Sequence, residues 1–71
     1  MNKKYGKNNK LTARELEVLR RLKDGKTSGE TAQLLDITER TVKFHISNIL
    51  RKLRAGNRTH AVATAMGQGL I

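Results

Sequence analysis

Residues 38–54, TERTVKFHISNILRKLR, constrain the fold more than any other part of the chain. Drawn as a helix, they place a narrow apolar stripe within an arc of roughly 60°, made of Val42, Ile46, Ile49 and Leu53. The opposite arc, of roughly 140°, carries cations, polar side chains and one aromatic residue: Arg40, Lys43, Phe44, Ser47, Asn48, Arg51 and Arg54. The stripe therefore predicts a helix with one face in a core and a basic face turned outward.

The outward face has two interpretations. A helix in a DNA major groove needs cations for phosphates and a few side chains for base edges, and this face supplies both. We interpret it as a recognition helix. In the alternative, the cations form an ordinary solvated face and Phe44 packs on a neighbouring helix.

Length and composition limit the fold to one small domain. The chain has 71 residues, no proline and no cysteine, so disulfides, thiolate metal sites and cysteine nucleophiles are excluded. It has no apolar run long enough for a signal peptide or a membrane span. We predict an all-α protein, a compact four-helix bundle with a central helix-turn-helix, located in the cytoplasm with the nucleoid.

The net charge of +9 is unevenly distributed. Residues 1–10 carry four lysines and no acid, residues 11–37 carry five basic and five acidic side chains, and residues 38–60 carry six basic and one acidic. Such a balance suits DNA, RNA or an anionic membrane, so charge alone does not choose among them.

The segments before residue 38 are read from local signals. Residues 1–10 have no periodicity and are predicted to be a flexible basic tail, either a linker or an arm on the DNA backbone. Residues 11–71 form the folded domain. Capping boxes start two helices, Thr12 with Glu15 and Thr27 with Glu30; these helices end near residues 23 and 35. Gly25 takes the left-handed position after the first helix.

The turn and the last helix complete the pattern. Residues 36–38 link two helices as a helix-turn-helix, with Ile37 in the core and Thr38 as the N-cap. Gly56 relieves the backbone after residue 54, and Asn57 caps a fourth helix over residues 58–68. Its apolar side either closes the protein's own core or is partly exposed and available for a symmetric partner.

Residues at fixed spacing give the chain a resemblance to a known family. The segments are Leu11-Thr12-Ala13-Arg14-Glu15, Gly25-Lys26-Thr27, Thr41-Val42-Lys43-Phe44-His45, Lys52-Leu53 and Asn57-Arg58. Together they resemble the LuxR-type helix-turn-helix domain over nearly all of residues 11–71. The resemblance implies a DNA-binding transcriptional regulator, or its C-terminal module, of the quorum-sensing or response-regulator type. Thr31 stands where the family usually has isoleucine, and Ser47 where many members have a long cation.

The resemblance also implies partners and sites. Double-stranded DNA is the expected partner, with base contacts from Lys43, Phe44 and Ser47. Phosphate contacts fall on Thr27, Ser28, Thr38, Arg40, Thr41, Asn48, Arg51 and Arg58. A homodimer forms through the fourth helix, with Val62, Ala65 and Met66 at its interface, and a fused or separate N-terminal regulatory domain is expected.

The sequence gives no sign of catalysis. His45 and His60 are the only imidazoles, on different predicted helices, and His45 is expected to pack near the core edge. We expect no enzyme activity, catalytic residue, metal or cofactor.

One alternative is a small interaction module that pairs with a larger LuxR-type regulator and inhibits it. A membrane-active peptide and a nonspecific RNA binder fit less well, because capping boxes indicate a packed globule and few aromatics are available for stacking.

Overall fold

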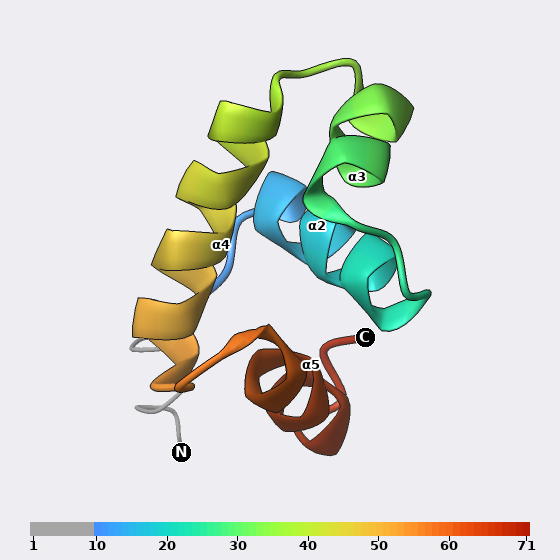
Figure 1. Ribbon diagram of the computed structural model, residues 1–71. Helices are drawn as coiled ribbons and strands as arrows, with labels where there is room; N and C mark the ends of the chain where they lie inside the picture. Colours follow the sequence, from blue (N-terminus) through green and yellow to red (C-terminus); the bar gives the residue numbers. More distant parts are fainter. Residues whose placement is uncertain (1–9) are drawn as a thin grey trace.

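The computed structural model describes residues 10–71, which form four helices and no strand. The helices are α2 (Ala13–Lys23), α3 (Ser28–Leu35), α4 (Glu39–Leu53) and α5 (Arg58–Gly67). In Figure 1, α4 lies along one side of the molecule and contacts the other three helices. The all-α prediction is confirmed. The predicted basic tail lies, apart from Lys10, outside the described residues.

Both predicted capping boxes are present. At the start of α2, the Thr12 hydroxyl accepts from the Glu15 backbone N–H at 3.0 Å, and the Glu15 carboxylate accepts from the Thr12 N–H at 2.9 Å. Thr27 and Glu30 repeat the arrangement at 3.0 and 2.9 Å. An N-cap of this kind stabilises a helix by about 0.5–2 kcal/mol. These local bonds explain why α2 and α3 begin where the sequence predicts.

The helix ends confirm one prediction and correct another. Gly25 has φ +83° after α2, as expected. After α4, however, the left-handed residue is Arg54 with φ +54°, and Gly56 does not adopt a positive φ. The reason is that the reversal follows the last helical residue directly, so that the Ala55 N–H can bond to the Leu50 carbonyl at 2.9 Å. The prediction that Gly56 relieves the backbone is therefore wrong.

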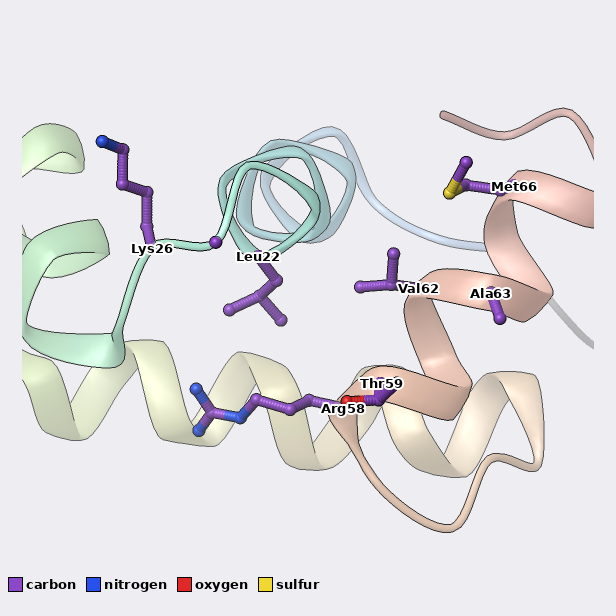
Figure 2. Close-up of a pocket in the computed structure, with 8 residues that line it drawn as sticks. Leu22, Lys26, Arg58, Thr59, Val62, Ala63 and Met66 are labelled. Atoms are coloured by element: carbon purple, nitrogen blue, oxygen red, sulfur yellow. The ribbon is translucent and has the colours of Figure 1, made fainter.

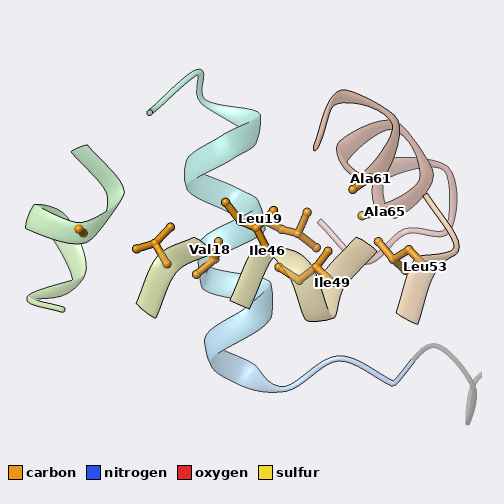
Figure 3. Close-up of a cluster of buried hydrophobic side chains, with 9 residues drawn as sticks. Val18, Leu19, Ile46, Ile49, Leu53, Ala61 and Ala65 are labelled. Carbon is orange, nitrogen blue, oxygen red and sulfur yellow. The ribbon is translucent and has the colours of Figure 1, made fainter. Parts of the chain in front are cut away.

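The core forms where α4 meets the other helices (Figure 3). All four residues of the predicted apolar stripe of α4 are buried, and they pack with Val18, Leu19, Ala32, Ala61 and Ala65. Ile37 is half-buried against this cluster, as the helix-turn-helix interpretation requires. Burial of the stripe fixes the rotation of α4 and leaves its opposite face outward.

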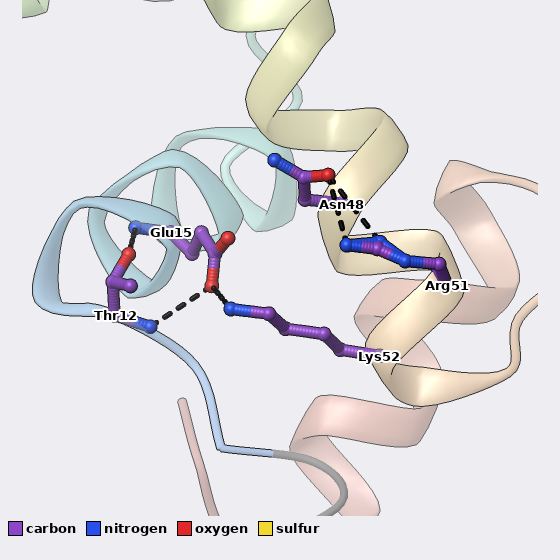
Figure 4. Close-up of polar contacts among 5 residues, drawn as sticks. All are labelled: Thr12, Glu15, Asn48, Arg51 and Lys52. Carbon is purple, nitrogen blue, oxygen red and sulfur yellow. Dashed lines mark hydrogen bonds and ion pairs between the residues drawn. The ribbon is translucent and has the colours of Figure 1, made fainter.

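Three polar residues are buried in the described part of the chain, Ser28 together with Glu15 and Thr31. Glu15 is buried, and its carboxylate accepts from Lys52 Nζ at 2.8 Å, which ties the start of α2 to the last turns of α4 (Figure 4). Thr31 of α3 is 0% exposed, and its hydroxyl has no hydrogen-bond partner among residues 10–71. Thr31 is thus a fully buried polar side chain at a position where the resemblance implies isoleucine.

Candidate nucleic-acid interface

The outward face of α4 is exposed as predicted. Arg40, Lys43, Phe44, Ser47, Arg51 and Arg54 are all exposed, and Asn48 is half-buried. Phe44 is 62% exposed, its ring centroid lying 5.9 Å from that of the half-buried His45. The alternative in which Phe44 packs on a neighbouring helix is therefore wrong. An exposed aromatic among cations is a surface suited to nucleic-acid bases and phosphates.

Short-range polar contacts order this face. Arg51 donates to Asn48 Oδ1 through both terminal nitrogens, at 3.4 and 3.2 Å, on the solvent side of α4 (Figure 4). At the N-terminus the Thr38 hydroxyl accepts from the Thr41 N–H at 3.1 Å and donates to the Thr41 hydroxyl at 2.9 Å. Lys43 Nζ lies 3.4 Å from Glu39 Oε2. Five of these six side chains were expected to contact DNA; Glu39 was not.

The start of α3 differs in part from the expectation. Thr27 is exposed, but Ser28 is buried and its hydroxyl accepts from Arg58 Nη2 at 3.0 Å. This bond joins the first residues of α3 and α5, which are 30 positions apart in the chain. Ser28 therefore positions Arg58 in this structure, and only Arg58 of the two reaches the surface.

The residues expected at the dimer interface divide into two groups. Met66 is 49% exposed and Val62 is half-buried, whereas Ala65 is 0% exposed and packs in the core. Leu22 and Val62 point into a groove of about 420 Å³ between α2 and α5 that Met66 also lines (Figure 2). Lys26 and Arg58 line the same groove. The apolar side of α5 is thus partly exposed, which was one of the two alternatives.

Two acidic side chains have perturbed ionisation. Burial by itself raises the pKa of Glu15, but the hydrogen bonds from Lys52 and Thr12 and the Lys52 charge together hold that pKa below its ordinary value. The backbone N–H of Thr27 lowers the pKa of the exposed Glu30. In both capping boxes the hydrogen bonds to the carboxylate thus favour its ionised form.

The described part of the chain has neither a cluster of metal ligands nor a membrane-spanning helix. Residues 10–71 contain no group of three or more His, Cys, Asp or Glu side chains that could hold a metal ion. None of their helices is long and apolar enough to cross a bilayer.

Comparison with known proteins shows which family has this sequence and fold. Residues 9–65 match the family described as bacterial regulatory proteins, luxR family. The chain belongs to the LuxR family. Over 63 residues this LuxR-family domain is 56% identical to the HTH-type quorum sensing-dependent transcriptional regulator RpaR of Rhodopseudomonas palustris, covering 89% of this chain and 26% of RpaR. It is also 51% identical over 61 residues to the quorum-sensing regulator RhlR of Pseudomonas aeruginosa, covering 86% of this chain and 25% of RhlR.

Solved structures agree with the fold of this LuxR-family domain. SdiA of Escherichia coli matches with a TM-score of 0.84 and 43% identity over 89% of this chain and 26% of SdiA. The transcription factor GerE matches with a TM-score of 0.81 and 33% identity over 84% of this chain and 90% of GerE. The chain thus spans about a quarter of the length of the curated relatives it matches. The family consists of DNA-binding transcriptional regulators, which confirms the functional class predicted from the sequence. It also confirms the expectation that the domain is not an enzyme.

The sequence analysis did not predict three of the side-chain contacts described above. Glu15–Lys52 and Ser28–Arg58 join residues 37 and 30 positions apart, which no local pattern reveals. Glu39–Lys43 has the i, i+4 spacing of a helical ion pair, so the sequence did contain its signal.

Proposed function

We propose that residues 11–71 are the DNA-binding domain of a sequence-specific transcriptional regulator that binds a two-fold symmetric operator as a dimer. The observation that carries the proposal is the face of α4 opposite its buried stripe, where cations surround a 62% exposed Phe44. A helix of this kind fits the major groove, and a dimer would place two of them on half-sites about one helical turn apart. Membership of the LuxR family supports DNA as the partner.

We assign base reading to Lys43, Phe44 and Ser47. Lys43 would donate to guanine O6 and N7, and Phe44 would lie against a thymine methyl group. Ser47 is exposed between them on the same face, and its short hydroxyl suits a direct or water-mediated contact.

Phosphate contacts surround these residues in the proposal. Exposed or half-buried groups from α4, from α5 and from the N-caps of α3 and α4 supply them: Thr27, Thr38, Arg40, Thr41, Asn48, Arg51 and Arg58. Ser28 would act through Arg58, whose Nη2 donates a hydrogen bond to the Ser28 hydroxyl at 3.0 Å. Backbone contacts of this kind fix the orientation of α4 without reading sequence.

Dimerisation is proposed through Val62 and Met66 on the exposed side of α5. Ala65, which the sequence analysis included, packs inside the protomer, so it would act only by bringing α5 close to the core. Because this chain spans about a quarter of RpaR and RhlR, we also propose that a regulatory domain, fused or separate, controls the dimer. A place in the cytoplasm at the nucleoid follows from binding chromosomal DNA.

Enrichment of random duplexes on the purified protein tests this function. We expect one palindromic motif, bound at least about 10³-fold more tightly than random DNA. If about 6–10 phosphates are neutralised, affinity falls on the order of 10³- to 10⁵-fold between 50 and 200 mM salt. Recovery of no motif contradicts the proposal. Mixed dimers with a LuxR-type regulator and no footprint on DNA would support the inhibitory interaction module instead.

A further inference from the structure

Glu39 is the one acidic side chain among residues 38–60, and it lies in the first turn of the proposed recognition helix. Its Oε2 is 3.4 Å from Lys43 Nζ, with the two side chains 54% and 62% exposed. Ion pairs as exposed as this one contribute little to stability. A carboxylate on a surface that must approach phosphates also weakens binding to DNA in general. Neither stability nor general affinity for DNA therefore explains Glu39. Because it lies beside Lys43, the lysine proposed to contact guanine, a role in base recognition is the remaining explanation.

The ion pair presents a donor beside an acceptor. A lysine ammonium only donates hydrogen bonds and an ionised carboxylate only accepts them. In the major groove, a G·C pair presents the guanine O6 acceptor beside the cytosine N4 donor. Because these two base atoms are hydrogen-bonded to each other, they lie about 2.9 Å apart. The 3.4 Å between Lys43 Nζ and Glu39 Oε2 is close to that spacing.

The order of donor and acceptor discriminates among base pairs. At the same two positions, C·G and A·T pairs present a donor followed by an acceptor. A donor would then face the Lys43 ammonium and an acceptor would face the Glu39 carboxylate, so neither hydrogen bond could form. A T·A pair has the right order at these two atoms. It places a methyl group, however, where G·C offers guanine N7 as a second acceptor for Lys43. Only G·C offers a hydrogen-bond partner to each side chain and a second acceptor to the Lys43 ammonium.

We propose that Glu39 is a specificity-determining residue, whose carboxylate accepts a hydrogen bond from N4 of the cytosine paired with the guanine that Lys43 contacts. The proposal rests on the proposed insertion of α4 in the major groove. Lys43 and Glu39 then read one G·C pair as a unit. Their contact in the free protein places both side chains together before DNA arrives, which reduces the rotamer entropy lost on binding. The other carboxylate oxygen lies 3.6 Å from the point that a Cβ would occupy if residue 29 carried one, so the Glu39 side chain lies beside the start of α3.

Base preferences of four proteins test the proposal: wild type, Lys43→Ala, Glu39→Ala and the double variant. Binding to the selected operator and to duplexes with each base pair replaced is measured for every protein. In the wild type, replacing the G·C pair read by this unit costs about 5- to 150-fold in affinity. We expect Lys43→Ala and Glu39→Ala to lose discrimination at that same base pair. The double variant should lose no more discrimination at that base pair than either single variant, because the effects of two substitutions in one unit are not additive.

Two further variants separate recognition from charge and folding. Glu17→Ala removes an acid of similar exposure, paired with Arg14 at 3.4 Å on α2, and should leave every base preference unchanged. Glu39→Gln keeps a carbonyl acceptor and adds amide donors, so it should still bind G·C and additionally accept adenine at that pair. Circular dichroism melting of each variant confirms that it is folded.

The outcomes distinguish this inference from the proposed function. If Glu39→Ala raises affinity for all duplexes by one factor and leaves the profile unchanged, Glu39 is only a repulsive charge and the inference is overturned. Loss of discrimination at a different base pair from Lys43→Ala overturns it as well. If the wild-type protein has no base preference at all, the proposed function itself fails.

Discussion

Thr31 shows how one hydroxyl can limit the stability of a small core. Its side chain is 0% exposed and, among the described residues, finds no hydrogen-bond partner. A buried unsatisfied polar group costs about 1–3 kcal/mol. We expect Thr31→Val, which has nearly the same shape, to raise the free energy of unfolding by about 1 kcal/mol and the melting temperature by about 4–8 °C.

The matched control for that change is Thr59→Val on α5, where the side chain is exposed. A surface substitution of this kind should change stability by less than about 0.5 kcal/mol. Thermal denaturation of the three proteins makes the comparison. A lower melting temperature for Thr31→Val would mean that the hydroxyl is hydrogen-bonded in the folded protein.

The Glu15 carboxylate gives stability a defined pH dependence. Because the pKa of Glu15 is lowered in the folded protein, its contribution is complete above the unfolded pKa of about 4.3 and is lost as pH falls through the folded value. Lys52→Met removes the partner at 2.8 Å and should cost about 1–3 kcal/mol at pH 7. It should also make stability fall less steeply on acidification, because the pKa of Glu15 is then no longer held down by Lys52.

Urea denaturation between pH 7 and pH 3 measures both effects. Lys23→Met, at an exposed lysine in the last turn of α2, is the control and should reproduce the wild-type pH profile. An unchanged acid slope in Lys52→Met would contradict the assignment of the lowered pKa to this ion pair.

At the scale of the element, α4 combines two kinds of contact that substitutions can separate. Lys43→Ala should relax discrimination at one base pair by about 1–3 kcal/mol, because it removes a base contact. Arg51→Ala should weaken specific and random DNA alike and lower the salt slope by about 0.9, because it removes one phosphate contact. Fluorescence anisotropy titrations at several salt concentrations give both numbers. Equal losses of Lys43→Ala on specific and random DNA would remove Lys43 from the base-reading set.

The elements also show what the sequence could predict. The starts of α2 and α3 followed from capping boxes, and those of α4 and α5 from the single N-cap residues Thr38 and Asn57. The buried stripe of α4 followed from its period, because these signals are all local. The end of α4 was predicted less well. Glycine is the usual left-handed residue, but the carbonyls of the last turn required the reversal at Arg54. The contacts Glu15–Lys52 and Ser28–Arg58 arise only from the packing of helices distant in sequence.

At the scale of the whole molecule, the exposed side of α5 should control assembly on DNA. Met66→Gln makes this surface polar without adding charge, so it should weaken binding to a complete operator while leaving a single half-site unaffected. Leu34→Gln, at a residue of α3 that is 53% exposed against 49% for Met66, is the matched control and should keep wild-type assembly. Analytical ultracentrifugation with operator and half-site duplexes checks this. Wild-type assembly by Met66→Gln would place the dimer interface elsewhere.

The account depends most on which surface of the domain touches the bases. Titration of isotope-labelled protein with its selected duplex, followed by amide resonances, measures this directly. We predict the largest shifts at Lys43, Phe44 and Ser47, with smaller ones at the starts of α3 and α5. Unchanged resonances on the outward face of α4, together with shifts confined to another surface, would contradict the account.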